Sequence, residues 1–288
     1  QSVYQSEAAL EKAFIEQLQK QAYEYLPVNE EKDLISNLRC QLEKLNHYSF
    51  SDKEWEDFFH NKLANHNNGI EEKTTIIQED YIQLLNCDNG STKNIYLIDK
   101  DNIHNNSLQV INQYVVNDGK YPNRYDVTIL VNGLPLVHIE LKRRGVDLKE
   151  AFNQINRYQR DSFWAESGLY EYVQLFVISN GTLTKYYSNT TRASHIREMS
   201  DVTGKPGKKT GNSFEFTSWW ADANNRPIFD LMDFTCTFFA KHTLLNILTK
   251  YCVFTTEKML LVMRPYQIVA TERILQRINT SNNYKKYG

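Results

Sequence analysis

The spacing of apolar residues follows a helical period over the first third of the chain. Residues 6–26 place apolar side chains repeatedly on one face, so we predict a helix there. Ser6 can cap this helix at its start, and Pro27 ends it. Residues 28–92 show the same periodicity in several pieces and predict further helices.

From Asn94 onward the period changes from helical to two, which is typical of half-buried strands. The dipeptide Asn132-Gly133 lies between two such strands and predicts a tight hairpin. The strands are expected at residues 94–99, 108–116, 124–131, 134–142, 172–180 and 182–188, with one amphipathic helix at 148–164. This order predicts an α/β (α+β) fold, in which helices flank a mixed central sheet.

The pattern also suggests how the chain divides into domains. We expect a first domain over residues 1–198. Residues 199–213 are rich in glycine and lysine and have no periodicity, so they predict a flexible loop. The helical pattern returns after the loop and predicts a helical linker over residues 214–260 and a last helix from residue 264.

Composition and charge narrow the class of protein. With 41% hydrophobic and 24% charged residues the chain can build a globular core. The net charge of −2 means that contact with nucleic acid would come from local patches. No apolar run approaches the length of a membrane span, so we expect no membrane contact. The four cysteines lack metal-ligand spacing and predict reduced, buried thiols in a cytosolic protein; they are Cys40, Cys87, Cys236 and Cys252.

The candidate chemistry lies in the predicted hairpin. His138, Glu140 and Lys142 point to one face of its second strand, while Asp126 lies on the first. A two-residue turn at Asn132-Gly133 would place Asp126 beside Ile139 instead of Glu140. Asp126 and Glu140 therefore meet only if the loop has three residues or if a bulge shifts the register elsewhere.

Two carboxylates brought together favour a cation between them. Oxygen ligands of this kind suit Mg²⁺ or Mn²⁺, and such an ion can polarise a phosphate and activate a water. Lys142 would then stabilise the charge that develops during phosphodiester hydrolysis. A paired-carboxylate glycosidase is a weaker alternative, because it leaves Lys142 without a role.

The competing interpretation of Glu140 and Lys142 is an ordinary surface ion pair. The flanking residues of both strands are too apolar for a fully solvated face. The following helix also carries Gln154 and Tyr158 one turn apart, with Arg157 beside them, so that it can reach back over the sheet. His138 lies beside the site and is expected to support or pack against it.

The stretch YDVTILVNGLPLVHIELKRR, followed by EAFNQINRY, resembles the nuclease domain of HsdR, the restriction and translocation (R) subunit of type I restriction-modification enzymes. The resemblance covers nearly the whole chain. It implies a restriction-endonuclease-like PD-(D/E)xK core, whose motif falls on Asp126, Glu140 and Lys142. Gln154 and Tyr158 match a Q-x-x-x-Y motif that the family uses in DNA handling.

One position departs from the motif, since Tyr125 stands where the class has proline. Such folds often add a glutamate from the first helix, and Glu7, Glu11 and Glu16 all remain candidates. Arg143 and Arg144 are candidate phosphate contacts, as are the loop residues Lys205, Lys208 and Lys209.

Near the C-terminus, the sequence RPYQ is similar to the adenine-reading motif before the family's RecA-like motor, which assigns Gln267 to nucleotide binding. An ordinary helix start explains the same residues. Residues 261–288 would then begin a motor domain that is truncated before its P-loop.

The resemblance implies an N-terminal fragment of a bacterial cytoplasmic enzyme. Its nuclease domain would use Mg²⁺ (or Mn²⁺) to cut unmodified double-stranded DNA after ATP-driven translocation by the full-length subunit. The methyltransferase (M) and specificity (S) subunits would be its partners. The alternative is a nuclease-fold docking module that binds DNA or partner subunits without cutting.

Overall fold

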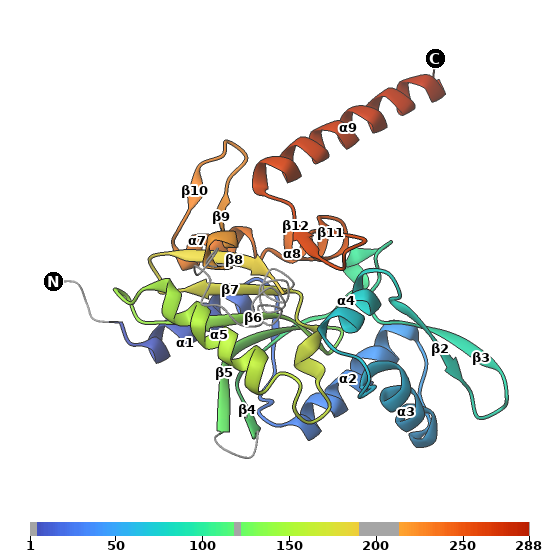
Figure 1. The fold of residues 1–288 in the computed structure, drawn as a ribbon. Helices are drawn as coiled ribbons and strands as arrows, with labels where there is room; N and C mark the ends of the chain where they lie inside the picture. Colours follow the sequence, from blue (N-terminus) through green and yellow to red (C-terminus); the bar gives the residue numbers. More distant parts are fainter. Residues whose placement is uncertain (1–4, 118–121, 190–212, 288) are drawn as a thin grey trace, which may run out of the picture.

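An eight-stranded mixed sheet forms the centre of the molecule (Figure 1). The computed structural model describes residues 5–117, 122–189 and 213–287. The strand order is β1-β4-β5-β6-β7-β8-β9-β10, with β1 parallel to β4, β6 parallel to β7 and the other neighbours antiparallel. The strands are β1 Glu24–Tyr25, β4 Leu108–Asn117, β5 Pro122–Val131, β6 Leu134–Leu141, β7 Leu175–Ser179, β8 Thr184–Ser188, β9 Ser218–Ala221 and β10 Pro227–Ile228.

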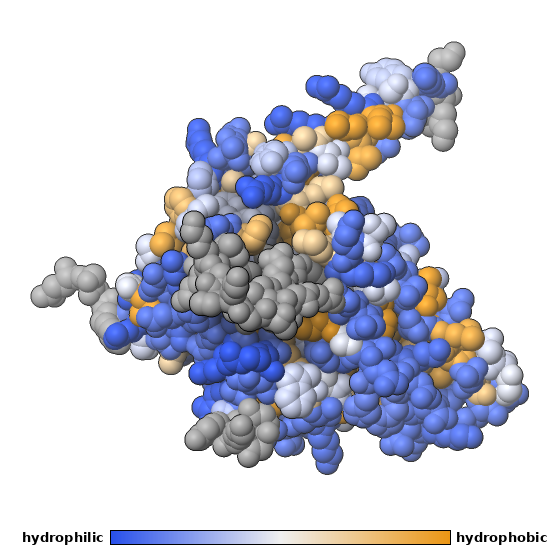
Figure 2. Space-filling model, viewed as in Figure 1, coloured by the Kyte–Doolittle hydropathy of each residue, from blue (hydrophilic) through white to orange (hydrophobic). Residues whose placement is uncertain are grey.

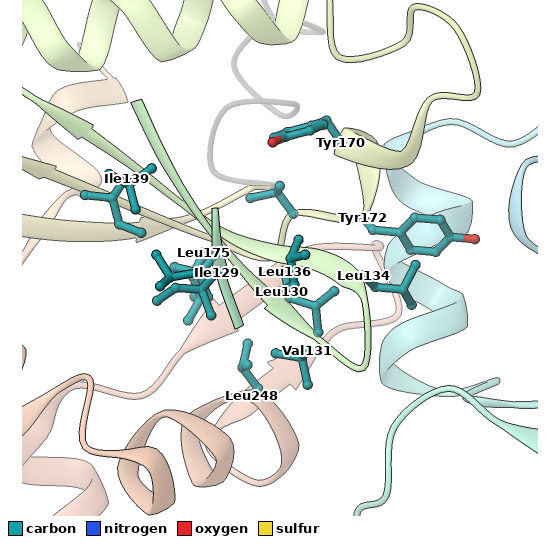
Figure 3. Close-up of a cluster of buried hydrophobic side chains, with 14 of the residues drawn as sticks. Ile129, Leu130, Val131, Leu134, Leu136, Ile139, Tyr170, Tyr172, Leu175 and Leu248 are labelled. Carbon is teal, nitrogen blue, oxygen red and sulfur yellow. The ribbon is translucent and has the colours of Figure 1, made fainter. Parts of the chain in front are cut away.

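Helices cover both faces of this sheet, as the sequence pattern predicted. They are α1 Glu7–Lys20, α2 Glu31–Asn46, α3 Asp52–Phe58, α4 Ile70–Gln78, α5 Leu148–Asp161, α7 Leu231–Thr237, α8 Lys241–Thr249 and α9 Pro265–Tyr287. Adjacent residues of β8 show which helices lie on which face. The ring of Tyr187 is 5.2 Å from Phe152 of α5, whereas that of Tyr186 is 5.1 Å from Phe238, which follows α7. Figure 3 shows the same two sides around the hairpin β5–β6, with Tyr170 on one side and Leu248 of α8 on the other.

The first helix begins where the sequence predicted but ends earlier. The hydroxyl of Ser6 accepts a hydrogen bond from the backbone N–H of Ala9, at 3.1 Å, and caps α1. The predicted extension to residue 26 is wrong, because Ala22 adopts a left-handed conformation with φ 68°. The chain then enters the short strand β1, which pairs with β4.

Residues 28–92 are only partly helical. A π-helical turn over Phe59–Leu63 follows α3, and α4 follows it. The prediction of helix throughout this range is wrong at its end, where β2 Ile82–Asn86 and β3 Thr92–Tyr96 form a separate hairpin. This hairpin projects from the body (Figure 1).

The C-terminal third combines predicted helices with strands that the pattern missed. The prediction of a purely helical segment over 214–260 is wrong, because β9 and β10 extend the main sheet. A small hairpin, β11 Cys252–Phe254 and β12 Leu260–Val262, precedes α9. The loop predicted at 199–213 lies outside the described residues except for its last residue. Helix α9 extends away from the body, and its exposed apolar side chains include Ile274, Leu275 and Ile278 (Figure 2).

The cysteines are free, as expected, but they are not buried. Cys40 and Cys236 are exposed, and Cys87 and Cys252 are partly exposed, so the prediction of buried thiols is wrong. Among the described residues, no helix combines the length and the apolar character that crossing a bilayer requires.

Candidate active site

A β-bulge brings Asp126 and Glu140 opposite each other. The hairpin turn has two residues, with Asn132 at φ 51° and Gly133 at φ 84°, and Val131 pairs with Leu134 across it. The register then shifts between Ile129 and Leu130, so that Val127 pairs with Ile139. One step further along this register, Asp126 lies across from Glu140. The second of the two routes predicted from the sequence, a bulge away from the turn, is therefore confirmed.

Glu140 is fully buried, which excludes the interpretation as a surface ion pair. Its side chain is 0% exposed, and its Oε2 lies 2.9 Å from Nε2 of His138, which is equally buried. The other carboxyl oxygen, Oε1, is buried without any hydrogen-bond partner. A buried carboxyl oxygen without a partner is costly and calls for an explanation, such as a bound ion.

Asp126 shares this environment. Its Oδ2 accepts a hydrogen bond of 2.9 Å from the backbone N–H of Leu141, at the point where β5 and β6 separate. Burial, and then the nearby charge of Glu140, raises the pKa of Asp126 from 3.8 to about 8. Burial likewise raises the pKa of Glu140, to about 8. Without a cation the pair therefore holds a proton at neutral pH.

His138 supports Glu140 as a neutral ring. Its burial lowers the pKa of the imidazole to about 4, so the contact with Glu140 is a hydrogen bond and not an ion pair. The ring stands edge-on to Tyr125 and Phe163, at centroid distances of 5.6 and 6.0 Å. The expectation that His138 supports the site agrees with this position.

Lys142 lies at the end of β6, where a chain of hydrogen bonds holds it. Its Nζ donates to Oε1 of Gln154, whose Nε2 donates to the hydroxyl of Tyr158 at 2.6 Å. The Tyr158 hydroxyl donates in turn to the carbonyl of Arg124 at 2.8 Å, next to Asp126 in the chain. The positive charge of Lys142 opposes the rise in the pKa of Glu140. The predicted catalytic lysine and the Q-x-x-x-Y pair therefore form one connected unit.

A cleft of about 740 Å³ opens beside Asp126. All three candidate glutamates of α1 line it, namely Glu7, Glu11 and Glu16. Burial raises the pKa of Glu11, and the charge of Asp126 adds to the rise. The charge of Glu11 also raises the pKa of Glu140. Glu11 is thus the α1 glutamate whose charge acts on both site carboxyls.

The basic residues predicted to contact DNA have different partners. The guanidinium of Arg157 lies over the ring of Tyr158, 5.5 Å from its centroid. Arg144 donates to the hydroxyl of Thr182 at 2.9 Å, and the backbone N–H of Arg143 donates to Glu7 at 3.3 Å. The loop lysines, Lys205, Lys208 and Lys209, lie outside the described residues.

Gln267 is not part of this site. It lies in the first turn of α9, where its Oε1 accepts a hydrogen bond of 2.9 Å from the backbone N–H of Arg264. This contact is that of an ordinary helix start. Its assignment to adenine recognition stays a prediction.

The donor set fits a magnesium-like ion better than a zinc-like one. The described residues contain no group of three or more His, Cys, Asp and Glu side chains arranged to hold a metal. Mg²⁺ needs fewer protein ligands, because it keeps several waters and uses one or two carboxylates. Asp126 and Glu140 provide these, and the free Oε1 of Glu140 provides an oxygen for the ion.

Two side chains that hold Glu11 escaped the sequence interpretation. Asn112 and Gln113, on β4, donate hydrogen bonds of 2.7 Å to the two carboxyl oxygens of Glu11. The available signal was an adjacent pair of amides within the otherwise largely apolar stretch LQVINQYVV. The pattern alone could not connect them to a residue about 100 positions earlier.

Comparisons of the sequence with known proteins identify its family. Residues 4–195 match the family described as the type I restriction enzyme R protein N terminus. The chain is 50% identical over 279 residues to the type I restriction enzyme EcoprrI endonuclease subunit of Escherichia coli, covering 96% of this chain and 84% of that protein. It is 37% and 35% identical to type I restriction enzyme endonuclease subunits of Staphylococcus saprophyticus and Staphylococcus aureus, covering 98% and 97% of this chain. It spans only 28% of the length of these two relatives.

Proposed function

The chain belongs to the family of the type I restriction enzyme R protein N terminus, and on that basis we propose that it is a magnesium-dependent endonuclease domain of the PD-(D/E)xK class. Its substrate would be double-stranded DNA, cut at phosphodiester bonds. The observation that carries the proposal is the fully buried Glu140, which keeps an unpartnered oxygen beside Asp126 and has Lys142 two residues away.

Each side chain has a role that follows from its position. Asp126 and Glu140 would hold the divalent cation and exchange their shared proton for it. When bound, the cation polarises the scissile phosphate and lowers the pKa of the attacking water. Lys142 would stabilise the charge that develops on the phosphate. Gln154 and Tyr158 fix the direction of the lysine and, with Arg143, Arg144 and Arg157, would guide the DNA strand.

Family membership supports a wider proposal for the whole protein. The full-length subunit would translocate DNA using ATP, and Gln267 would contact the adenine at the start of a RecA-like motor. It would work in the bacterial cytoplasm with methyltransferase and specificity subunits, which would choose the DNA site.

The metal site can be tested on this chain directly. Titration calorimetry with Mn²⁺ should show binding that disappears in Asp126→Asn and persists in Glu16→Gln, which changes an exposed carboxyl in the same cleft. Absence of binding to the unaltered protein would contradict a preformed metal site and favour the alternative, a docking module that does not cut.

The catalytic role is tested in the assembled enzyme. Lys142→Ala should abolish DNA cleavage while complex assembly and ATP-driven translocation continue, because the lysine stabilises only the charge formed during hydrolysis. Lys53→Ala, at an exposed position on α3, serves as the control. Cleavage that survives in Lys142→Ala would refute the assignment.

A further inference from the structure

The two amides that hold Glu11 come from neighbouring residues of one strand. Asn112 Nδ2 donates to Oε1 of Glu11 and Gln113 Nε2 donates to Oε2, each at 2.7 Å. Successive side chains of a regular strand point to opposite faces of the sheet. Two consecutive residues therefore cannot both reach one carboxylate from a regular strand.

Gln113 breaks the alternation through its backbone. Its φ is +52°, in the left-handed region that residues with a Cβ rarely occupy. The strand is otherwise continuous, since Asn112 pairs with Val127 on one side of it and Tyr114 with Tyr125 on the other. The pairing skips Gln113 and the residue across from it, which is Asp126. An unfavourable backbone conformation thus sits next to a predicted metal ligand, where strain is often kept for a function.

The second amide is oriented independently. The hydroxyl of Tyr25, on β1, donates to Oδ1 of Asn112 at 2.9 Å, which directs Nδ2 of Asn112 toward Glu11. The two amides use one acceptor position on each carboxyl oxygen of Glu11 and leave others available. Amides are neutral, so they hold the carboxylate in place without cancelling its negative charge, as a lysine or an arginine would.

We propose that Gln113 is a positioning residue, whose left-handed backbone turns its amide onto Glu11 and holds that carboxylate in the cleft, where its negative charge strengthens the binding of a cation by Asp126 and Glu140. The proposal rests on the proposed function. Glu11 and Asp126 line the same cleft, and the buried Oε1 of Glu140 lacks any partner among the described residues. The strain is therefore retained for metal binding and not for the stability of the fold.

Replacing Gln113 separates a role in metal binding from a role in the stability of the fold. Gln113→Gly removes the amide and also relieves the backbone strain, because glycine adopts positive φ freely. Calorimetry with Mn²⁺ should show an affinity at least about tenfold weaker, as expected when a residue that orients a charged group beside the metal is lost. The melting temperature should stay the same or rise. A falling melting temperature with unchanged Mn²⁺ affinity would identify Gln113 as a merely structural residue and overturn the proposal.

Two further variants complete the experiment. Gln83→Gly makes the same change on β2, where it should lower the melting temperature and leave Mn²⁺ affinity unchanged. Glu11→Gln should weaken Mn²⁺ binding, and adding Gln113→Gly should weaken it no further, because both act through one carboxylate. Additive losses would overturn the proposal while leaving the nuclease function intact. Absence of Mn²⁺ binding by the unaltered protein would overturn the proposed metal site, and this inference with it.

Discussion

Replacing Glu140 with glutamine should stabilise the metal-free protein at neutral and alkaline pH. The carboxyl is 0% exposed, and its Oε1 lacks a partner. Burial raises its pKa from 4.5 to about 8. Between these values the folded protein retains a proton that the unfolded chain has released, so stability falls as pH rises from about 4.5 to about 8. Glutamine has the same shape and does not titrate.

The size of the effect follows from the pKa shift. pH 7 lies 2.5 units above the pKa of 4.5 that Glu140 has in the unfolded chain. Keeping the proton in the folded protein at this pH therefore costs about 3 kcal/mol of stability. A glutamine amide in the same place has imperfect hydrogen bonding, which costs about 1 kcal/mol. The net gain for Glu140→Gln is therefore roughly 2 kcal/mol at pH 7, and below pH 4.5 it becomes a loss of about 1 kcal/mol.

Urea denaturation in EDTA at pH 5 and pH 8 measures this difference. The unaltered protein should lose stability between the two values, and Glu140→Gln should lose roughly 3 to 4 kcal/mol less. Glu16→Gln, at an exposed carboxyl in the same cleft, should follow the unaltered protein. Saturating Mn²⁺ should stabilise only the proteins that keep Glu140. Equal pH dependence in Glu140→Gln and the unaltered protein would refute the reasoning.

Two other substitutions test the hairpin and the hydrogen-bonded chain. Gly133→Ala would place a Cβ 2.6 Å from Leu38 Cα at a residue with φ +84°, so it should lower the free energy of unfolding by about 3 kcal/mol in urea denaturation. Gly90→Ala has the same φ but open space around its Cβ, so it should lower it by only about 1 kcal/mol. Equal losses in the two variants would contradict the clash. Tyr158→Phe removes the hydroxyl that accepts a hydrogen bond from Gln154, so it should lower the free energy of unfolding by about 1 kcal/mol. It should also slow plasmid cleavage by the assembled enzyme. Unchanged cleavage would show that Tyr158 has no role in DNA handling.

The elements that carry the site could be predicted from the sequence because their signals are local. The Asn132-Gly133 turn and the alternation around Glu140 identify the hairpin, and the amphipathic pattern after it identifies α5. The parity of the strand numbering also predicted that Asp126 and Glu140 could meet only through a three-residue loop or a bulge. The place of the bulge could not be predicted, because its extra residue, Leu136, is held by a distant segment: the backbone N–H of Gln174, just before β7, donates to the carbonyl of Leu136. Such a contact joins segments nearly 40 residues apart.

The missed strands have a similar explanation. β1 has two residues and β10 has two, too short for an alternating pattern to appear. β1 takes its strand conformation from pairing with β4, which is distant in the sequence. β10 takes its strand conformation from pairing with β9. The left-handed Gln113 has no local cause either, since glutamine does not favour positive φ. It accompanies the contact with Glu11, a residue about 100 positions earlier in the chain, which only the folded structure brings near.

The unfavourable features of the fold gather where β5 and β6 separate. There Glu140 is buried with a free oxygen, Asp126 and Glu140 retain a proton at neutral pH, and Gln113 holds a strained backbone. Each lowers the stability of the metal-free protein, and a divalent cation bound by the carboxylates would relieve the first two. A docking surface would have no need for buried, unpartnered carboxyl oxygens. For this reason the arrangement supports a nuclease site, and the proteins that keep Glu140 should be the ones that Mn²⁺ stabilises.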